Sequence, residues 1–503
     1  MAERLKLFIN GQWVESKTEK YTPIYNPSTG EIQAEAPCCT KDEVEAAIAA
    51  AKAAYPGWRN TPPIKRAQIM YRVRELLIEH MEELTDSVAR ENGKAWAEAQ
   101  GDVLKAKEGT EVACSIPTLL NGMGESLMDA SSGFDTVLYR EPLGVFAGII
   151  PFNFPAMIPM GWMTPICVAS GNTIVLKAAS FTPMTAQKIA KLYQEAGLPD
   201  GVINIVTCSR HEAEIFLSHP DIKGISFVGS TKVGLSIYSK AATNGKRVQA
   251  LCEAKNHALV LEDAPIERTA AGIINASFGC AGERCMALPV VCVQESIADE
   301  LVEAIVKKAK ELRVGPAYDK NTDMGPVINA EHKKFVTDWI EKGVKEGAEL
   351  VLDGRNVQVE GYENGFYVGP TIFDHVTEDM TIGTYEVFGP VLCIKRVKDF
   401  EEGLAIMNRN PFANGSVIFT QNGHYAREFA KRTDGGMVGV NVGIPVPVGF
   451  FPFSGHKNSF FGDLHTLGRD GVRFYTETKS VTTRWFDEEE KKKDKVSTWD
   501  GTI

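Results

Sequence analysis

The stretch "NTIVLKAASFTPMTAQKIAKLYQEAGLPDGVINIV", residues 172–206, decides the fold class. It begins and ends with short apolar runs, NTIVLK and VINIV, of the kind found in buried strands. Between them lies a helical pattern, with Pro183 near its start and Gly197 just past its end. This placement is typical of helix boundaries. Strand, helix and strand in this order predict parallel strands in a doubly wound sheet.

The alternation continues towards the C-terminus. KGISFV is a predicted strand at 223–228 and is followed by a predicted helix at 229–242. The same unit recurs at 289–294 and 296–312, where PVVCVQ precedes a long amphipathic pattern. Towards the N-terminus, residues 61–125 are mostly helical in pattern. The sequence therefore predicts an α/β protein with two doubly wound parallel-sheet domains.

Composition excludes several classes of function. The chain has 503 residues, 44% hydrophobic and 24% charged, as expected for a globular protein of two or three domains. Its net charge of -11 argues against a nucleic-acid partner. The most apolar stretch, 142–176, contains five prolines, so we expect no membrane-spanning helix and no membrane partner. The ten cysteines are scattered, which is typical of a reduced, cytoplasmic protein.

The motif "SFGCAGERCMALP", residues 277–289, is the main candidate for chemistry. A metal pair is disfavoured, because a zinc site needs about four ligands and the nearest histidine in sequence is His257. A thioredoxin-type pair has two intervening residues, and here there are four. Cys280 lies among small apolar residues and is predicted to pack as a core side chain. Cys285 follows polar residues, and the neighbouring Arg284 favours a nucleophilic thiolate.

FGCAGERCMA resembles the active-site segment of the aldehyde dehydrogenase superfamily, and most closely that of its methylmalonate-semialdehyde dehydrogenase branch. Other segments resemble the family in the expected order: LFINGQWV, PFNFPAMIP, SFVGS, YEVFGPV and the C-terminal stretch 450–482. The resemblance covers nearly the whole chain. It implies a small β oligomerisation flap beside the two α/β domains.

The resemblance also implies domain boundaries. They are a dinucleotide-binding domain at 1–123 and 143–254, a catalytic domain at 255–445, the flap at 124–142 and 474–486, a return segment at 446–473, and a flexible tail at 487–503. A flap whose strand edges need covering implies a homodimer or homotetramer.

In this family a cysteine thiolate attacks an aldehyde, and the resemblance assigns that role to Cys285. The resulting thiohemiacetal carries an oxyanion, for which the side chain of Asn153 and the backbone N–H of Cys285 are the expected donors. Without the resemblance, the favoured interpretation of Asn153 is a turn residue between prolines. Loss of hydride to the nicotinamide then leaves a thioester on Cys285. No metal is expected.

Eight residues from separate segments are the candidates for contact with NAD or NADP: Phe152, Lys177, Ser180, Arg210, Gly229, Ser230, Glu386 and Phe388. Lys177 matches a contact to the adenosine ribose, and Glu386 and Phe388 match contacts to the nicotinamide ribose and ring. Gly229 and Ser230 begin a helix whose N-terminus can face the pyrophosphate.

The type of dinucleotide is open. Many NAD-using relatives have an acidic residue at the position of Ser180, and its absence favours NADP or use of both cofactors. Arg210 is then a candidate partner for a 2′-phosphate. It is equally a candidate for an ordinary surface arginine.

Release of the acyl group is also open. Hydrolytic relatives carry a glutamate where this chain has Leu251, as in the branch that passes its acyl group to coenzyme A. Glu253, however, stands where that branch has glycine. If the strand extends to it, its side chain shares a face with that of Leu251 and can replace the missing base. A solvent-facing Glu253 is the alternative, and it leaves coenzyme A as the acceptor.

The expected substrate is a small aldehyde, with an anionic semialdehyde favoured. The branch holds a substrate carboxylate with the arginine before the nucleophile, here Arg284, and with an arginine on a preceding helix. That second position is Lys105 here, which supplies a point charge without a bidentate fork. Two other readings remain: a hydrolytic enzyme of the same fold, and an inactive relative kept as a binding or structural protein.

Overall fold

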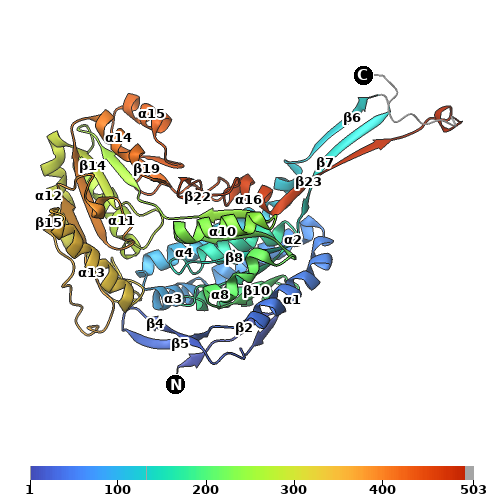
Figure 1. Ribbon diagram of the computed structural model, residues 1–503, viewed down its shortest axis with the longest axis horizontal. Helices are drawn as coiled ribbons and strands as arrows, with labels where there is room; N and C mark the ends of the chain where they lie inside the picture. Colours follow the sequence, from blue (N-terminus) through green and yellow to red (C-terminus); the bar gives the residue numbers. More distant parts are fainter. Residues whose placement is uncertain (1, 132, 493–503) are drawn as a thin grey trace.

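The structure is a computed structural model that describes residues 2–131 and 133–492. It has two α/β bodies, each built on its own sheet, and an arm that projects from the first body (Figure 1). Of the predicted tail, residues 493–503 lie outside the described part of the chain. Within the described residues, no helix is both long enough and apolar enough to cross a membrane.

The first body contains an eight-stranded sheet in the order β22-β12-β11-β8-β9-β10-β2-β3. Its five central strands pair in parallel, as predicted, and β2, β3 and β22 complete the two edges in antiparallel pairing. The bounds are β2 (Leu7–Ile9), β3 (Gln12–Val14), β8 (Val145–Ile149), β9 (Thr173–Lys177), β10 (Ile203–Val206), β11 (Ile222–Val228), β12 (Arg247–Leu251) and β22 (Phe460–Phe461).

Helices of the first body begin and end where local signals predict. The helix α1 (Lys41–Arg59) starts at a capping box formed by Thr40 and Glu43. The helix α7 (Met184–Glu195) follows Pro183, and Gly197 lies just beyond it with a φ of 87°. Between β10 and β11 the chain forms two short helices, α8 (Arg210–Ala213) and α9 (Ile215–Ser218).

The remaining helices of this body cover the sheet. They are α2 (Pro63–Glu79), α3 (Met81–Asn92), α4 (Trp96–Cys114), α5 (Ile116–Asn121), a π-helical turn η1 (Ile158–Met163), α6 (Thr164–Ala169), α10 (Thr231–Thr243) and α16 (Gly468–Tyr475). The predicted helical region 61–125 is confirmed by α2 to α5. A smaller sheet combines β1 (Glu3–Arg4), β4 (Tyr21–Asn26) and β5 (Glu31–Pro37).

The second body contains a seven-stranded sheet in the order β15-β16-β17-β14-β13-β19-β20, parallel except at β15. The strands are β13 (His257–Val260), β14 (Val290–Gln294), β15 (Glu349–Leu352), β16 (Thr371–Asp374), β17 (Val391–Val397), β19 (Gly415–Phe419) and β20 (Met437–Val440). The helices are α11 (Ile266–Phe278), α12 (Glu295–Glu311), α13 (Ala330–Lys345), α14 (Phe400–Arg409) and α15 (Gly423–Arg432). The predicted fold class of two doubly wound sheets is confirmed.

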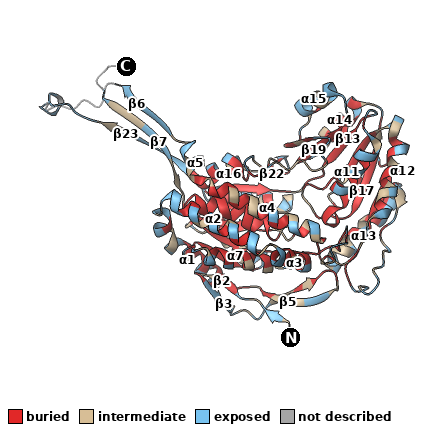
Figure 2. Ribbon diagram, turned by 180° about the vertical axis from the view of Figure 1, so that it is seen from behind, coloured by how far each residue is buried: buried red, intermediate tan, exposed pale blue. Residues whose placement is uncertain are grey.

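The arm is a three-stranded antiparallel sheet. It contains β6 (Glu125–Ser131), β7 (Phe134–Pro142) and β23 (Thr476–Arg484), with β7 in the middle. Buried residues concentrate around the two large sheets, whereas in the arm β6 and most of β23 are exposed and β7 is mostly half-buried (Figure 2). Leu127, Met128 and Trp485 are each more than 60% exposed. An apolar surface of this kind on a strand edge favours contact with another chain.

Candidate active site

Cys285 lies in a loop of the second body, after α11 and before β14. The three-residue run leading to it is left-handed, with φ values of 51°, 52° and 74° at Cys280, Ala281 and Gly282. No residue with a side chain can replace Gly282, because its Cβ would lie 2.1 Å from the carbonyl oxygen of Gly389. Non-glycine residues in this conformation are strained, so the surrounding contacts must hold the loop in place.

Side-chain amides hold the loop on both sides of the cysteine. Asn153 Nδ2 donates to the carbonyl of Glu283 at 3.0 Å and is buried. The amides of Asn256 and Asn414 donate to the carbonyl of Cys285 at 3.0 and 3.3 Å. An amide nitrogen carries two hydrogens, so Asn153 has a second donor beside the hydrogen bond to Glu283. Asn256 and Asn414 were missed by sequence reasoning, because an asparagine in a loop carries no signal of this role.

A cavity of about 510 Å³ opens onto Cys285 and contains both predicted substrate residues, Arg284 and Lys105. Its apolar wall comes from three segments of the chain: Phe154, Met157, Trp162, Ile444, Val446 and Phe453. A small apolar space with a few charged groups suits a small organic substrate.

The Cys285 thiol is not activated in the way the sequence suggests. Its pKa is raised to about 12, first by burial and then by the charge of Glu386, and the ammonium of Lys94 opposes this rise. The charge of Arg284 acts on Cys280, where it opposes the rise in pKa caused by burial. The prediction that Arg284 favours a thiolate at Cys285 is therefore corrected, since this guanidinium is paired elsewhere.

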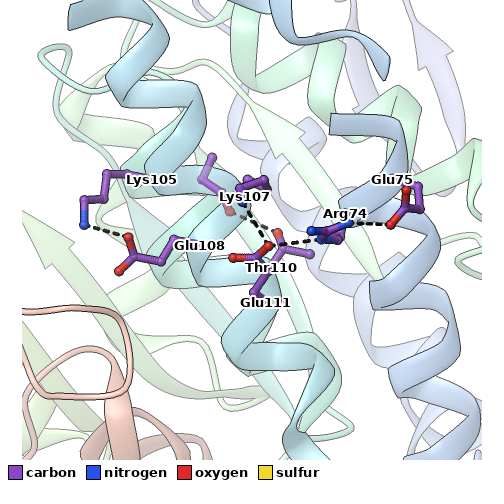
Figure 3. A network of polar contacts seen from close by, with 8 residues as sticks. Arg74, Glu75, Lys105, Lys107, Glu108, Thr110 and Glu111 are labelled. Atoms are coloured by element: carbon purple, nitrogen blue, oxygen red, sulfur yellow. Dashed lines mark hydrogen bonds and ion pairs between the residues drawn. The ribbon is translucent and has the colours of Figure 1, made fainter. Parts of the chain in front are cut away.

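Arg284 and Lys105 each have a carboxylate partner. Arg284 Nη2 forms an ion pair with Glu98 Oε1, and both side chains are largely buried. Lys105 Nζ pairs with Glu108 at 2.6 Å on the same helix, α4, at the more exposed edge of the cavity (Figure 3). Sequence reasoning did not identify Glu98, because acidic residues are common in the first turn of a helix and carry no signal of a functional role.

The predicted adenosine residues come together at the carboxyl ends of β9 and β10. Lys177 and Arg210 line one cavity of about 200 Å³ together with Glu214 and Ser236, and its other walls are apolar: Ile149, Ala213, Leu217, Val233 and Ile237. Apolar walls with cationic side chains suit an adenine with its ribose or ribose phosphate. Burial lowers the pKa of Lys177. Ser180 is half-buried in the turn three residues beyond Lys177.

The predicted nicotinamide residues also meet, although they are far apart in sequence. The rings of Phe152 and Phe388 are 6.0 Å apart in an edge-to-face arrangement. Glu386 accepts a hydrogen bond from the backbone N–H of Ala254 at 3.1 Å. Burial raises the pKa of Glu386 to about 8, and the charge of Glu253 contributes.

Glu253 lies at the N-terminus of α10. Its Oε2 accepts a hydrogen bond from the backbone N–H of Thr231 at 2.9 Å, directly after Gly229 and Ser230. The strand β12 ends at Leu251, so strand alternation does not apply to Glu253. The carboxylate thus occupies a donor of the helix end that the sequence assigns to a pyrophosphate.

Known proteins of one family are similar to this chain over nearly its full length. The sequence model of the aldehyde dehydrogenase family matches residues 13–481. A malonate-semialdehyde dehydrogenase 2 of Geobacillus kaustophilus (strain HTA426) is 50% identical over 96% of this chain and 99% of its own. The methylmalonate-semialdehyde dehydrogenase DddC of Oceanimonas doudoroffii has a crystal structure with a TM-score of 0.95 and 43% identity, over 97% of this chain and 99% of that one.

A protein of Sinorhizobium meliloti 1021, whose crystal structure is a complex with NAD, also has a TM-score of 0.95, with 41% identity over 97% of this chain and 99% of that chain. The fold and these relatives define an oxidoreductase. The chain belongs to the aldehyde dehydrogenase family.

Proposed function

We propose that this enzyme oxidises a small semialdehyde with NAD or NADP and passes the acyl group to coenzyme A. Relatives at about half identity over nearly the full chain are named malonate-semialdehyde dehydrogenases. The cavity beside Cys285 carries two cationic side chains, Arg284 and Lys105, which suit a substrate with a carboxylate.

In the proposed reaction the Cys285 sulfur attacks the aldehyde carbon. The second amide hydrogen of Asn153 and the N–H of Cys285 stabilise the oxyanion; removing one such donor costs about 100-fold or more in rate. The bound dinucleotide supplies the hydride acceptor. Phe152, Phe388 and Glu386 would hold its nicotinamide end, and Lys177 and Arg210 its adenosine end. Asn256 and Asn414 keep the thiol in place by fixing the Cys285 carbonyl.

One observation carries the choice of acyl acceptor: the Glu253 carboxylate is bound at α10, and Leu251 is at the position where hydrolytic relatives have their base. A water molecule without a general base attacks a thioester slowly, since such bases contribute about 100-fold or more. A thiol such as coenzyme A then competes successfully. The alternative is hydrolysis. With Glu253 as the base it requires Glu253 to leave α10, and by water alone it proceeds without a general base.

Further parts of the proposal concern the protein as a whole. We propose that residues 1–123 and 143–254 bind the dinucleotide, that 255–445 carry the nucleophile, and that 446–473 return the chain to the first body. The arm at 124–142 and 474–486 is then the surface of a homodimer or homotetramer, supported by its exposed apolar residues. Ten free cysteines support a cytoplasmic location.

The test supplies purified enzyme with malonate semialdehyde or propanal, each with NAD or NADP, in the presence and absence of coenzyme A. We expect reduced dinucleotide to form rapidly only when coenzyme A is present, and acyl-coenzyme A to be the product detected by mass spectrometry. A rate independent of coenzyme A, with free acid as product, would establish the hydrolytic alternative. No reaction with any aldehyde would point to an inactive relative.

A further inference from the structure

We infer that the buried ion pair of Lys94 and Asp102 is a positioning unit for the oxyanion donor. It holds residues 152–157, the oxyanion segment, so that Asn153 stays within reach of an aldehyde oxygen bound at Cys285. The inference deepens the proposed function and rests on it, because it concerns a donor to the tetrahedral intermediate. Neither member of the pair has a role in the reaction proposed above.

The ion pair lies where the end of α3 and the first half of α4 meet. Lys94 follows Gly93, which ends α3 with a φ of 90°, and Asp102 lies within α4. Lys94 Nζ is 2.8 Å from Asp102 Oδ2, and the two side chains are 1% and 0% exposed. Burial raises the pKa of Asp102, and the ammonium of Lys94 opposes that rise. Each charge therefore depends on the other, because solvent screens neither of them.

Each member of the pair contacts the oxyanion segment directly. Asp102 Oδ1 accepts a hydrogen bond from the backbone N–H of Met157 at 2.6 Å, while its Oδ2 faces Lys94. Lys94 Nζ lies 3.4 Å from the centroid of the Phe154 ring, which is a cation–π contact. The ion pair thus binds the segment at two points, both on the C-terminal side of Asn153.

The other end of the oxyanion segment is held at its first carbonyl. The side chains of Asn92 and Thr182 donate to the carbonyl of Phe152 at 3.0 and 2.9 Å. Asn153 lies between these two sets of anchors, and it directs one amide hydrogen to the carbonyl of Glu283, two residues before the nucleophile. The position of its second amide hydrogen therefore depends on the anchors at both ends of the segment.

The energetics of buried ion pairs favour a role in positioning over a role in stability. Removing two charges from water costs free energy that their attraction often does not recover, so apolar residues of similar volume often replace such a pair without loss of stability. Apolar side chains between α3 and α4 cannot, however, accept the hydrogen bond of the Met157 N–H. The ion pair adds direction, because the ammonium holds one carboxylate oxygen and the other is aimed at the oxyanion segment.

The experiment is a double-mutant cycle between Lys94→Met and Asn153→Ala, assayed on malonate semialdehyde and on propanal with coenzyme A and dinucleotide saturating. In the wild-type background Lys94→Met should lower kcat about 100-fold, because a displacement of the donor by about 1 Å has an effect of this size. Dinucleotide affinity should stay within about twofold.

In the Asn153→Ala background the same substitution should lower kcat less than about threefold. The donor that Lys94 positions is then absent, and only the charge of Lys94 on the Cys285 thiol still contributes. Equal losses of kcat in the two backgrounds, or no loss in the wild-type background, overturn the inference.

Two variants separate positioning from a general effect of buried charge. Lys246→Met removes another buried ammonium of the first body, which donates to the carbonyls of His219 and Ile222 near the amino ends of β11 and β12. It should keep kcat within about threefold, and a loss equal to that of Lys94→Met overturns the inference. The double variant Lys94→Met/Asp102→Leu should keep the wild-type midpoint of urea unfolding but lose kcat as Lys94→Met does. It replaces Lys94→Met in the cycle if the single variant does not fold, and wild-type kcat in it overturns the inference.

A measurement without substrate separates this inference from the proposed function. Amide hydrogen exchange is followed by mass spectrometry in the peptide that contains residues 152–157, with the peptide that contains β11 as the internal reference. Because Lys94→Met/Asp102→Leu removes the acceptor of the Met157 N–H, exchange in the first peptide should speed up about tenfold or more, and the reference should be unchanged. This result supports the inference even if no aldehyde is oxidised, in which case only the proposed function fails. Unchanged exchange in the oxyanion segment overturns the inference whatever the activity.

Discussion

Arg284 on the substrate side and the N-terminus of α10 on the cofactor side are both suited to an anion, and each already holds a carboxylate of the protein itself. On the substrate side, Glu98 pairs with a full positive charge and a backbone N–H in a largely buried place. On the cofactor side, the half-buried Glu253 accepts from a single N–H at 2.9 Å.

The two sites differ in the free energy needed to replace the protein's own carboxylate with the anion of a ligand. The end of a helix carries about half a unit charge, and an ion placed there gains about 0.3–1 kcal/mol when exposed. A buried carboxylate paired with a guanidinium interacts more strongly, and leaving it buried without a partner has a large free-energy penalty. The cofactor side should therefore exchange Glu253 for a phosphate readily, whereas the substrate side should resist the exchange of Glu98.

The largest expected effect is the loss of catalysis on the substrate side, with dinucleotide binding on the cofactor side unchanged. Cys285→Ala should lower the rate for every aldehyde by about 1,000-fold or more, because the covalent route is lost. Its dinucleotide affinity, measured by fluorescence titration, should stay at the wild-type value. Cys280→Ala is the control, with a rate within about threefold of wild type. An active Cys285→Ala would show that the thiol beside Arg284 is not the nucleophile.

The next effect concerns the pKa of the Cys285 thiol. It tests whether Arg284, which pairs with Glu98, fails to lower that pKa. Because burial raises the pKa of Cys285 to about 12, the thiolate fraction rises about tenfold with each pH unit below that value. Alkylation of the unliganded enzyme by iodoacetamide should therefore speed up about 100-fold between about pH 7 and pH 9. Labelling is read at the peptide containing Cys285. A plateau near neutral pH would contradict the raised pKa and reopen a thiolate paired with a cation.

A smaller effect is expected at the N-terminus of α10, where a phosphate should replace Glu253 at a low free-energy cost. Glu253→Gln should bind ADP-ribose about fivefold more tightly, since the repulsion between a carboxylate and the pyrophosphate is removed. Adenosine, which has no phosphate, should bind both proteins equally in the same calorimetric titration. Glu98→Gln serves as the matched variant and should leave ADP-ribose affinity unchanged. Weaker binding of ADP-ribose to Glu253→Gln would mean that Glu253 supports the phosphate site.

The smallest effect concerns Arg210, which is exposed at the edge of the adenosine cavity. Exposed ion pairs contribute about 0.2–1 kcal/mol, so Arg210→Ala should weaken NADP binding about three- to fivefold. NAD binding should change less than twofold, because NAD lacks the 2′-phosphate. Equal affinities of the variant and the wild type for NADP would show that Arg210 is a surface residue that does not contact the cofactor.

Much of the fold is determined locally and was accessible from the sequence. The boundaries of α7 and the alternation of strands with helices appear in the structure at the predicted places. Resemblance to the family likewise anticipated that distant residues meet, as Phe152 and Phe388 do. The antiparallel edge strands and the break between α8 and α9 were not predicted, because both depend on contacts outside their own segment.

The partners of Arg284 and Glu253 were decided by tertiary structure alone. Arg284 follows two small residues and a glutamate in sequence, but its carboxylate partner is 186 residues away on α4. Glu253 is bound by α10, a helix that precedes it by some twenty residues. Periodicity and capping act over a few residues and can be read from the chain. The effect of a charge depends on distance in space and on burial, so the sequence by itself determined the fold and the nucleophile's neighbourhood, and only the folded structure decided which charges are free to bind a ligand.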